Sequence, residues 1–153
     1  MTKNISGFLD QSIRPIFDNV CKDTTIIDGT SFIRGITDYV KKGLLKPSTL
    51  FCTIDIRNLF TMLPQEEALK ILVQFLDESG YKKVDKIHST TIKQLASIVL
   101  EENVFVYGNK IYRQIIGGAM GSSFTLTLAN IFMWHWQQKL VNEQNQFGEF
   151  FGR

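Results

Sequence analysis

The hydrophobic and polar positions along the chain predict helices interrupted by one strand and one hairpin. In residues 5–19 the apolar side chains follow helical spacing, and Pro15 predicts a kink or a break. Ser6 is the candidate N-cap of that helix. Residues 28–43 predict a second helix, with Thr30 or Ser31 as its cap and Gly43 at its end.

More helices are expected further along the chain. They run from Pro64 to Gly80, from Ser89 to about residue 103, and from Phe124 to about residue 142. Before the last of them, residues 104–115 alternate around Gly108 and Asn109, a pattern typical of a β-hairpin. The last helix is apolar on most sides, which predicts a central place in the core.

Residues 50–57 predict a strand, because apolar side chains occupy every second position. One face would pack against helices and carry Leu50, Cys52, Ile54 and Ile56. The other face would stay open to solvent or a ligand and carry Phe51, Thr53, Asp55 and Arg57. With the hairpin, this strand predicts an α+β domain that has a small, mostly antiparallel sheet and helices packed on one face.

Composition and charge narrow the class of protein. The 153 residues fit one domain, and 12 Phe are many for a soluble domain. A formal charge of +2 is too small to indicate a nucleic-acid partner by itself. Cys21 and Cys52 lack the spacing of a zinc site or a disulfide framework, which favours a reducing, intracellular compartment. The sequence shows no signal-peptide pattern and no apolar run of about 20 residues, so we expect a soluble protein without a membrane partner.

Asp55 is the first candidate for chemistry, because it is the acidic residue of the predicted strand. A carboxylate there is costly to desolvate unless it is paired or holds a metal. One interpretation is an ion pair with Arg57 on the same face. The other is a Mg²⁺ site, because Mg²⁺ takes oxygen ligands and often only one or two from protein. The residues alone leave both interpretations open.

A second candidate is the run of small residues before the last helix. Gly117, Gly118 and Gly121 allow the backbone to approach a ligand closely. Ser122 and Ser123 can cap the helix or contact a phosphate. The alternative is a flexible turn followed by a capped helix, and a glycine-rich turn by itself does not separate the two.

Taken together, the two candidates fit the first and second polymerase boxes of a reverse transcriptase. The sequences "LFCTIDIRNLFTMLPQEEAL", "NKIYRQIIGGAMGSSFTLTLANIFMWHWQQKL" and "GEFFGR" resemble the reverse transcriptase of Penelope-like retroelements. "ISGFLDQSIRPIFD" and "TSFIRGITDYVKKG" are similar to the segments before the first box of that family. The resemblance implies a single partial reverse transcriptase domain over 1–153, with residues 1–47 as a helical segment before the palm and 48–153 as an incomplete palm.

The resemblance also implies roles for residues of the first box. In such polymerases three palm aspartates hold two Mg²⁺ ions, which activate the primer 3′-hydroxyl and stabilise the leaving pyrophosphate. Asp55 would be one of these aspartates, and the backbone carbonyl of Ile56 would be the neighbouring metal ligand. Phe60 would be the bulky aromatic residue that excludes a ribose 2′-hydroxyl and so favours deoxynucleotides.

For the second box, the resemblance implies contacts with nucleotide and template. Met120 and Gly121 would lie under the nascent base pair. Ser122, Ser123 and Asn130 would contact template and primer. The implied partners are an RNA template, a DNA primer and deoxynucleoside triphosphates, and the implied location is the nucleus. The oligomeric state stays open.

The chain departs from the family pattern in two respects. Ser123 and Leu126 stand where the family usually has proline, which loosens the entrance of the helix. In the family, sequences like "GEFFGR" run into a Tyr-x-Asp-Asp box with the other two aspartates, whereas this chain stops at Arg153. The fingers segment is expected before residue 1. We therefore expect at most weak Mg²⁺ binding and no catalysis by this chain alone.

Three alternatives remain at the level of sequence. The chain could be a non-catalytic remnant of a reverse transcriptase that binds nucleic acid or a partner. It could belong to a telomerase or group II intron type of reverse transcriptase, which Met rather than Gln at position 120 disfavours. It could also be an α+β domain with no polymerase role.

Overall fold

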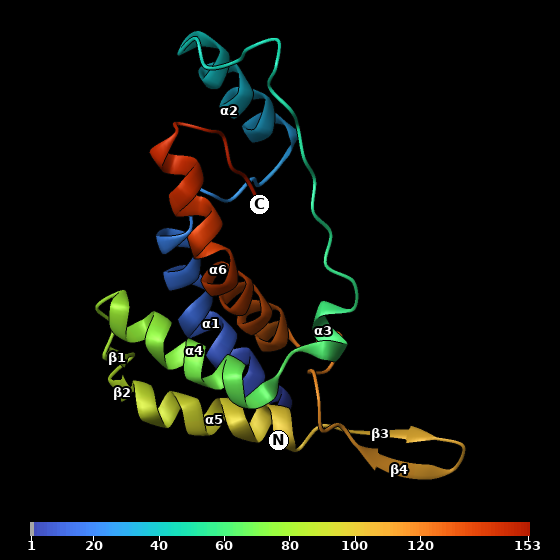
Figure 1. Ribbon diagram of the computed structural model, residues 1–153. Helices are drawn as coiled ribbons and strands as arrows, with labels where there is room; N and C mark the ends of the chain where they lie inside the picture. Colours follow the sequence, from blue (N-terminus) through green and yellow to red (C-terminus); the bar gives the residue numbers. More distant parts are fainter. Residues whose placement is uncertain (1) are drawn as a thin grey trace.

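The computed structural model describes residues 2–153 and has an α+β fold, as predicted (Figure 1). In chain order, its elements are α1 (Thr2–Val20), α2 (Gly29–Lys41), α3 (Leu59–Met62), α4 (Gln65–Glu78), β1 (Lys83–Val84), β2 (Ile87–His88), α5 (Ser89–Glu101), β3 (Val104–Tyr107), β4 (Lys110–Arg113) and α6 (Ser123–Gln146). None of the helices within these residues is both long and apolar enough to cross a bilayer.

The core lies among helices α1, α4, α5 and α6, which pack against one another (Figure 1). Leu9 and Ile13 of α1, Leu72 of α4 and Leu128 of α6 are fully buried there. Burial of such a side chain contributes about 1.5–3 kcal/mol, so these helices form the stable body of the protein. The predicted central position of the last helix is confirmed.

Helix α1 is not broken, although Pro15 lies inside it. Proline removes one backbone donor, but the buried apolar residues on both sides of it hold the helix together. Ser6 is not the N-cap of α1 either, because the helix starts at Thr2. Instead the buried Ser6 hydroxyl accepts a hydrogen bond from the backbone N–H of Phe124, at the start of α6.

Other helix ends follow local capping chemistry. Asp28, rather than the predicted Thr30 or Ser31, caps α2, and its side chain accepts from the backbone N–H of Ser31 in a capping box. Pro64 immediately precedes α4, and Gly80 follows it with a φ of +84°. Both of these predicted ends of α4 are confirmed. His88 rather than Ser89 is the N-cap of α5.

The strand predicted over residues 50–57 does not form. This segment is extended chain that pairs with no strand within residues 2–153 (Figure 1). Its apolar face does not pack against helices, because Leu50 and Ile54 are 84% and 69% exposed. The alternating side chains are typical of a β-strand. A strand also requires a neighbouring strand to which it is hydrogen-bonded, and the alternation gives no information about that neighbour.

The predicted hairpin is confirmed as β3–β4, with Val104 opposite Arg113 and Tyr107 opposite Lys110. Gly108 and Asn109 both have positive φ, at +54° and +62°, as a type I′ turn requires. A shorter hairpin, β1–β2, was not predicted. The two hairpins are separate sheets, so the prediction of one sheet covered by helices on one face is wrong for the described residues.

Helix α2 lies apart from the core and packs against Glu149 and Phe150 (Figure 1). The Tyr39 hydroxyl donates to the carboxylate of Glu149 at 2.5 Å. The ring of Phe150 meets Phe32 edge-on, with 6.1 Å between ring centroids, and fills the space beside Gly35. The C-terminal residues therefore connect α2 to the body of the protein.

Candidate functional site

The candidate site is the junction between α3 and the turn at residues 117–122, which leads into α6. Two backbone hydrogen bonds close this junction: Gly117 N–H donates to the carbonyl of Leu63, and Gly118 N–H donates to that of Phe60, both at 2.8 Å. The Gln65 side chain donates to the carbonyl of Gly117, also at 2.8 Å. The segment of the first predicted box is therefore fixed directly to that of the second.

Gly117 is required at this junction by geometry. Its φ is +76°, and a Cβ at this position would lie 2.4 Å from the carbonyl oxygen of Phe60. Gly118 is also crowded, because a Cβ there would meet the methyl group of Thr125 at 2.6 Å. The close approach that these glycines allow is thus to the protein itself, whereas the sequence suggested approach to a ligand.

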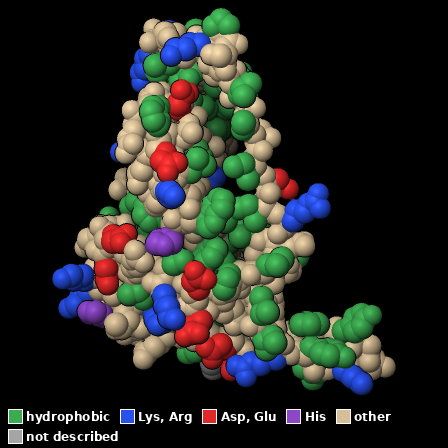
Figure 2. Space-filling view, in the orientation of Figure 1, with side chains coloured by type: hydrophobic (Ala, Val, Ile, Leu, Met, Phe, Trp, Pro, Cys, Tyr) green, Lys and Arg blue, Asp and Glu red, His purple; other side chains and the backbone are tan. Residues whose placement is uncertain are grey.

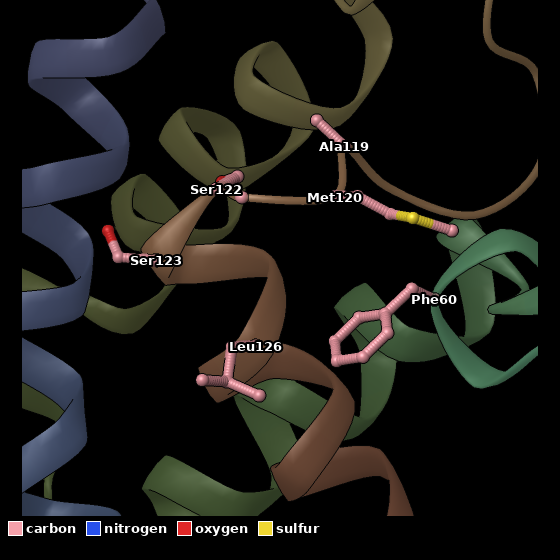
Figure 3. A pocket seen from close by; sticks show the side chains of 7 residues that line it. Phe60, Ala119, Met120, Ser122, Ser123 and Leu126 are labelled. Atoms are coloured by element: carbon pink, nitrogen blue, oxygen red, sulfur yellow. The ribbon is translucent and has the colours of Figure 1, made fainter.

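A cavity of about 350 Å³ opens between α3 and the start of α6 (Figure 3). Its lining residues are Phe60, Ala119, Met120, Gly121, Ser122, Ser123 and Leu126. The side chain of Phe60 comes from α3, whereas all the others come from the turn and the first part of α6. The structure thus brings together most of the residues that sequence analysis predicts for nucleotide and template contacts. Its apolar walls suit a flat, weakly polar group such as a base.

The start of α6 carries the predicted hydroxyl groups, which are partly engaged within the protein. Ser122 is the N-cap of α6, and its hydroxyl accepts from the backbone N–H of Thr125 at 3.3 Å. The hydroxyl groups of Ser122 and Ser6 are hydrogen-bonded to each other, at 2.9 Å. Ser123 makes no such bond within the described residues and is one of the lining residues of the cavity, with its hydroxyl directed toward α1 (Figure 3). The sequence pattern assigned Ser6 to the start of its own helix, because its actual partners lie more than a hundred positions away.

A second cavity, of about 310 Å³, lies next to the same turn. It is lined by residues from α1 and α5 as well as from the turn, among them Lys3, Ser6, Asn103 and Ser122. Neither Lys3 nor Asn103 was a predicted site residue. No local pattern marks either of them, because only the docking of α1 and α5 beside the turn brings them there.

Asp55 and Ile56 lie on the extended segment just before α3, and both are exposed. Neither is among the residues that line the 350 Å³ cavity. Asp55 forms no ion pair with Arg57 within the described chain, so that interpretation is wrong. No cluster of three or more His, Cys, Asp or Glu side chains occurs in residues 2–153. A single exposed carboxylate holds Mg²⁺ at most weakly.

Asn130 is not part of the cavity lining but belongs to a cluster around the C-terminal arginine. Its backbone carbonyl accepts from the guanidinium of Arg153 at 3.0 Å, and that guanidinium also lies 5.0 Å from the centre of the Phe17 ring. Burial lowers the pKa of Arg153 and raises the pKa of the neighbouring Cys21 thiol to about 11. The contacts of Arg153 stabilise the fold between α1 and α6. Burial, which outweighs the opposing effect of the nearby Arg153 cation, makes Cys21 an unreactive thiol.

Comparisons of this chain with protein-family models, with curated proteins and with solved structures found no match.

Proposed function

We propose that this chain forms part of the palm of an RNA-directed DNA polymerase of the Penelope-like type. In its parent protein it would help to extend a DNA primer on an RNA template. The observation that carries the proposal is the shared cavity: Phe60 of the first predicted box and residues 119–123 of the second line the same space. The sequence does not by itself require the two boxes to lie side by side, since more than fifty residues separate them.

The geometry supports distinct roles for the cavity residues. The Phe60 ring projects into the space between Met120 and Leu126 (Figure 3). A rigid aromatic wall there would collide with a ribose 2′-hydroxyl but would tolerate deoxyribose, because a hard steric contact distinguishes the two sugars. Met120 and the backbone at Gly121 would form the apolar floor under the base pair.

Asp55 would be the metal ligand that this chain contributes. Its carboxylate is exposed and is not engaged by a hydrogen bond or an ion pair within residues 2–153, so both oxygens are open to a cation. Mg²⁺, when bound, would supply Lewis-acid chemistry at the primer 3′-hydroxyl and the leaving pyrophosphate. The resemblance assigns two further aspartates to a Tyr-x-Asp-Asp box, so the activity is proposed for a protein that carries all three.

The extended segment at residues 50–57 supports a palm sheet in that parent protein. Its side chains alternate as in a strand, and its apolar positions such as Leu50 and Ile54 are exposed. An additional strand would satisfy its free backbone groups, and further packing would cover its apolar face. We propose that the small, mostly antiparallel sheet of the palm forms there, with Asp55 on the face that receives the metal.

The first test concerns Asp55 in a protein that carries the Tyr-x-Asp-Asp box. Asp55→Asn should abolish Mg²⁺-dependent primer extension on an RNA template, because it removes a negative ligand with almost no change in shape. Circular dichroism should show an unchanged fold, since Asp55 is exposed. Asp85→Asn, also exposed but distant in sequence from the box, is the control and should keep full activity. Retained extension by Asp55→Asn would refute the metal-ligand role.

The second test concerns Phe60. Phe60→Ala should raise the incorporation of ribonucleotides relative to deoxynucleotides by roughly tenfold or more, because it removes the proposed steric wall. Met62→Ala is the matched control, since Met62 lies in the same helix, is 66% exposed and does not line the cavity. Competition between the two nucleotide types in primer extension measures the ratio. A ratio that stays the same in Phe60→Ala would remove Phe60 from the nucleotide site.

A further inference from the structure

The β3–β4 hairpin projects from the helical body and has no neighbouring strand within the described residues (Figure 1). Every residue of its strands is exposed, including aromatic and aliphatic side chains. Figure 2 shows these hydrophobic side chains gathered on the projection at the lower right. Exposed apolar side chains in such number mark a binding surface rather than a part of the core.

The two faces of the hairpin differ in chemistry. Residues opposite each other in the register share a face, and side chains alternate along each strand. One face, here called the aromatic face, carries Phe105, Tyr107, Lys110 and Tyr112. The other, the aliphatic face, carries Val104, Val106, Ile111 and Arg113. The rings of Phe105 and Tyr112 are stacked, with 5.6 Å between centroids and 19° between planes, which confirms that they lie on the same side.

Among the described residues, the hairpin offers one unpaired cation, Lys110, to an anionic partner. Residues 103–116 contain two cations, Lys110 and Arg113, and no acidic residue. Arg113 is held at the base of the hairpin, where its guanidinium donates to the backbone carbonyl of Glu101 at 2.6 Å and lies 3.9 Å from the Glu101 carboxylate, so its charge is already paired. Lys110 has no ion-pair partner among residues 2–153 and lies opposite Tyr107 on the aromatic face.

We propose that the aromatic face of the β3–β4 hairpin binds single-stranded nucleic acid. Aromatic side chains stack on bases whatever the sequence, and a nearby cation pairs with the backbone phosphate. Tyr107, which is 74% exposed, offers an open ring for an incoming base, and Lys110 is in place for a phosphate. A purely apolar protein partner would be served as well by the aliphatic face and would gain nothing from Lys110. This surface is separate from the cavity at α3, so the inference does not require the polymerase proposal.

The test uses the 153-residue chain and fluorescently labelled oligo(U) and oligo(dT), with a DNA duplex for comparison. We expect both single strands to bind, as measured by fluorescence anisotropy, and the duplex to bind more weakly because its bases are already stacked. Tyr107→Ala should weaken binding about tenfold. Ile111→Ala, on the aliphatic face, is the matched control, because Ile111 is 76% exposed, and it should change the affinity less than twofold.

Lys110→Gln gives an independent readout. The salt dependence of binding reports the number of phosphates that the protein neutralises. In a plot of the logarithm of the binding constant against the logarithm of the salt concentration, each phosphate contact with a single strand adds about 0.7 to the steepness of the slope. We therefore expect this variant to lower the slope by about that amount, whereas Tyr107→Ala should leave the slope nearly unchanged. Thermal melts of all variants should agree with that of the original chain, since each substitution is at an exposed position.

Three outcomes would overturn the inference. The original chain could fail to bind either single strand, which would leave the face to a protein partner. Tyr107→Ala and Ile111→Ala could weaken binding equally. Binding could instead be lost in Phe60→Ala but kept in Tyr107→Ala, which would place the nucleic acid in the cavity. That result would agree with the polymerase proposal but would contradict binding by the aromatic face of the hairpin. A difference between oligo(U) and oligo(dT) would tell whether RNA or DNA is preferred.

Discussion

Replacement of Gly117 by alanine should detach α3 from the turn that leads into α6. The two backbone hydrogen bonds of this junction hold Phe60 at the edge of the cavity. A methyl group at position 117 would collide with the Phe60 carbonyl oxygen at 2.4 Å, and a backbone atom cannot rotate away as a side chain can. The segments therefore have to separate.

The size of the effect follows from two contributions. At a φ of +76°, a residue with a side chain costs about 1–2 kcal/mol more than glycine. Separation of the segments also breaks the bonds from Gly117 and Gly118, each of which contributes about 0.5–1.5 kcal/mol. We expect Gly117→Ala to lower the free energy of unfolding by about 2–5 kcal/mol in total.

Gly121 provides the matched control. It has a φ of +88° in the same turn, but a Cβ there would meet no atom within 4 Å. Gly121→Ala should therefore cost only the backbone strain, about 1–2 kcal/mol. Urea unfolding followed by circular dichroism measures both variants. Equal losses in the two variants would refute the argument that the Phe60 carbonyl is what requires glycine at position 117.

Two further predictions concern the core of the protein. Burial raises the pKa of Cys21 from 9.0 to about 11, so the folded state keeps a proton that the unfolded state loses, and stability should fall as the pH rises from about 9 to 11. In Cys21→Ala, the loss of stability that comes from the thiol should be absent, so the urea midpoint should fall less between pH 9 and 11. An equally steep fall of the urea midpoint in this variant would contradict the raised pKa of Cys21. Ser6→Ala should lower the free energy of unfolding by about 0.5–2 kcal/mol, because it removes the acceptor for Phe124 N–H. Ser123→Ala is the control in the same measurement, and a loss as large as that of Ser6→Ala would argue against the long-range cap.

Features that depend on neighbouring residues could be predicted from the sequence. The end of α4 at Gly80 and the turn at Gly108 and Asn109 follow from the backbone conformations that these residues favour. The helical segments follow from apolar spacing, since one face of each helix is buried in the shared core. In each case the information lies within a few residues of the feature.

Features that depend on distant partners could not be predicted in the same way. Residues 50–57 have the side-chain pattern of a strand, but the pattern does not state which segment pairs with them. Ser6 has the chemistry of a cap, but the helix it caps is α6 and not its own. The glycines at 117 and 118 signal a close approach, whereas only the fold shows that the approach is to Phe60 and Thr125. The meeting of the two predicted boxes at one cavity is likewise visible only in three dimensions.

The bond between Ser6 and the start of α6 has a consequence for the order of folding. The two residues lie 118 positions apart, so this contact closes a long loop. Neighbouring helices such as α4 and α5 can associate early, whereas contacts of such long range form late. During synthesis on the ribosome, the Ser6 hydroxyl can therefore cap the start of α6 only after residue 124 has emerged.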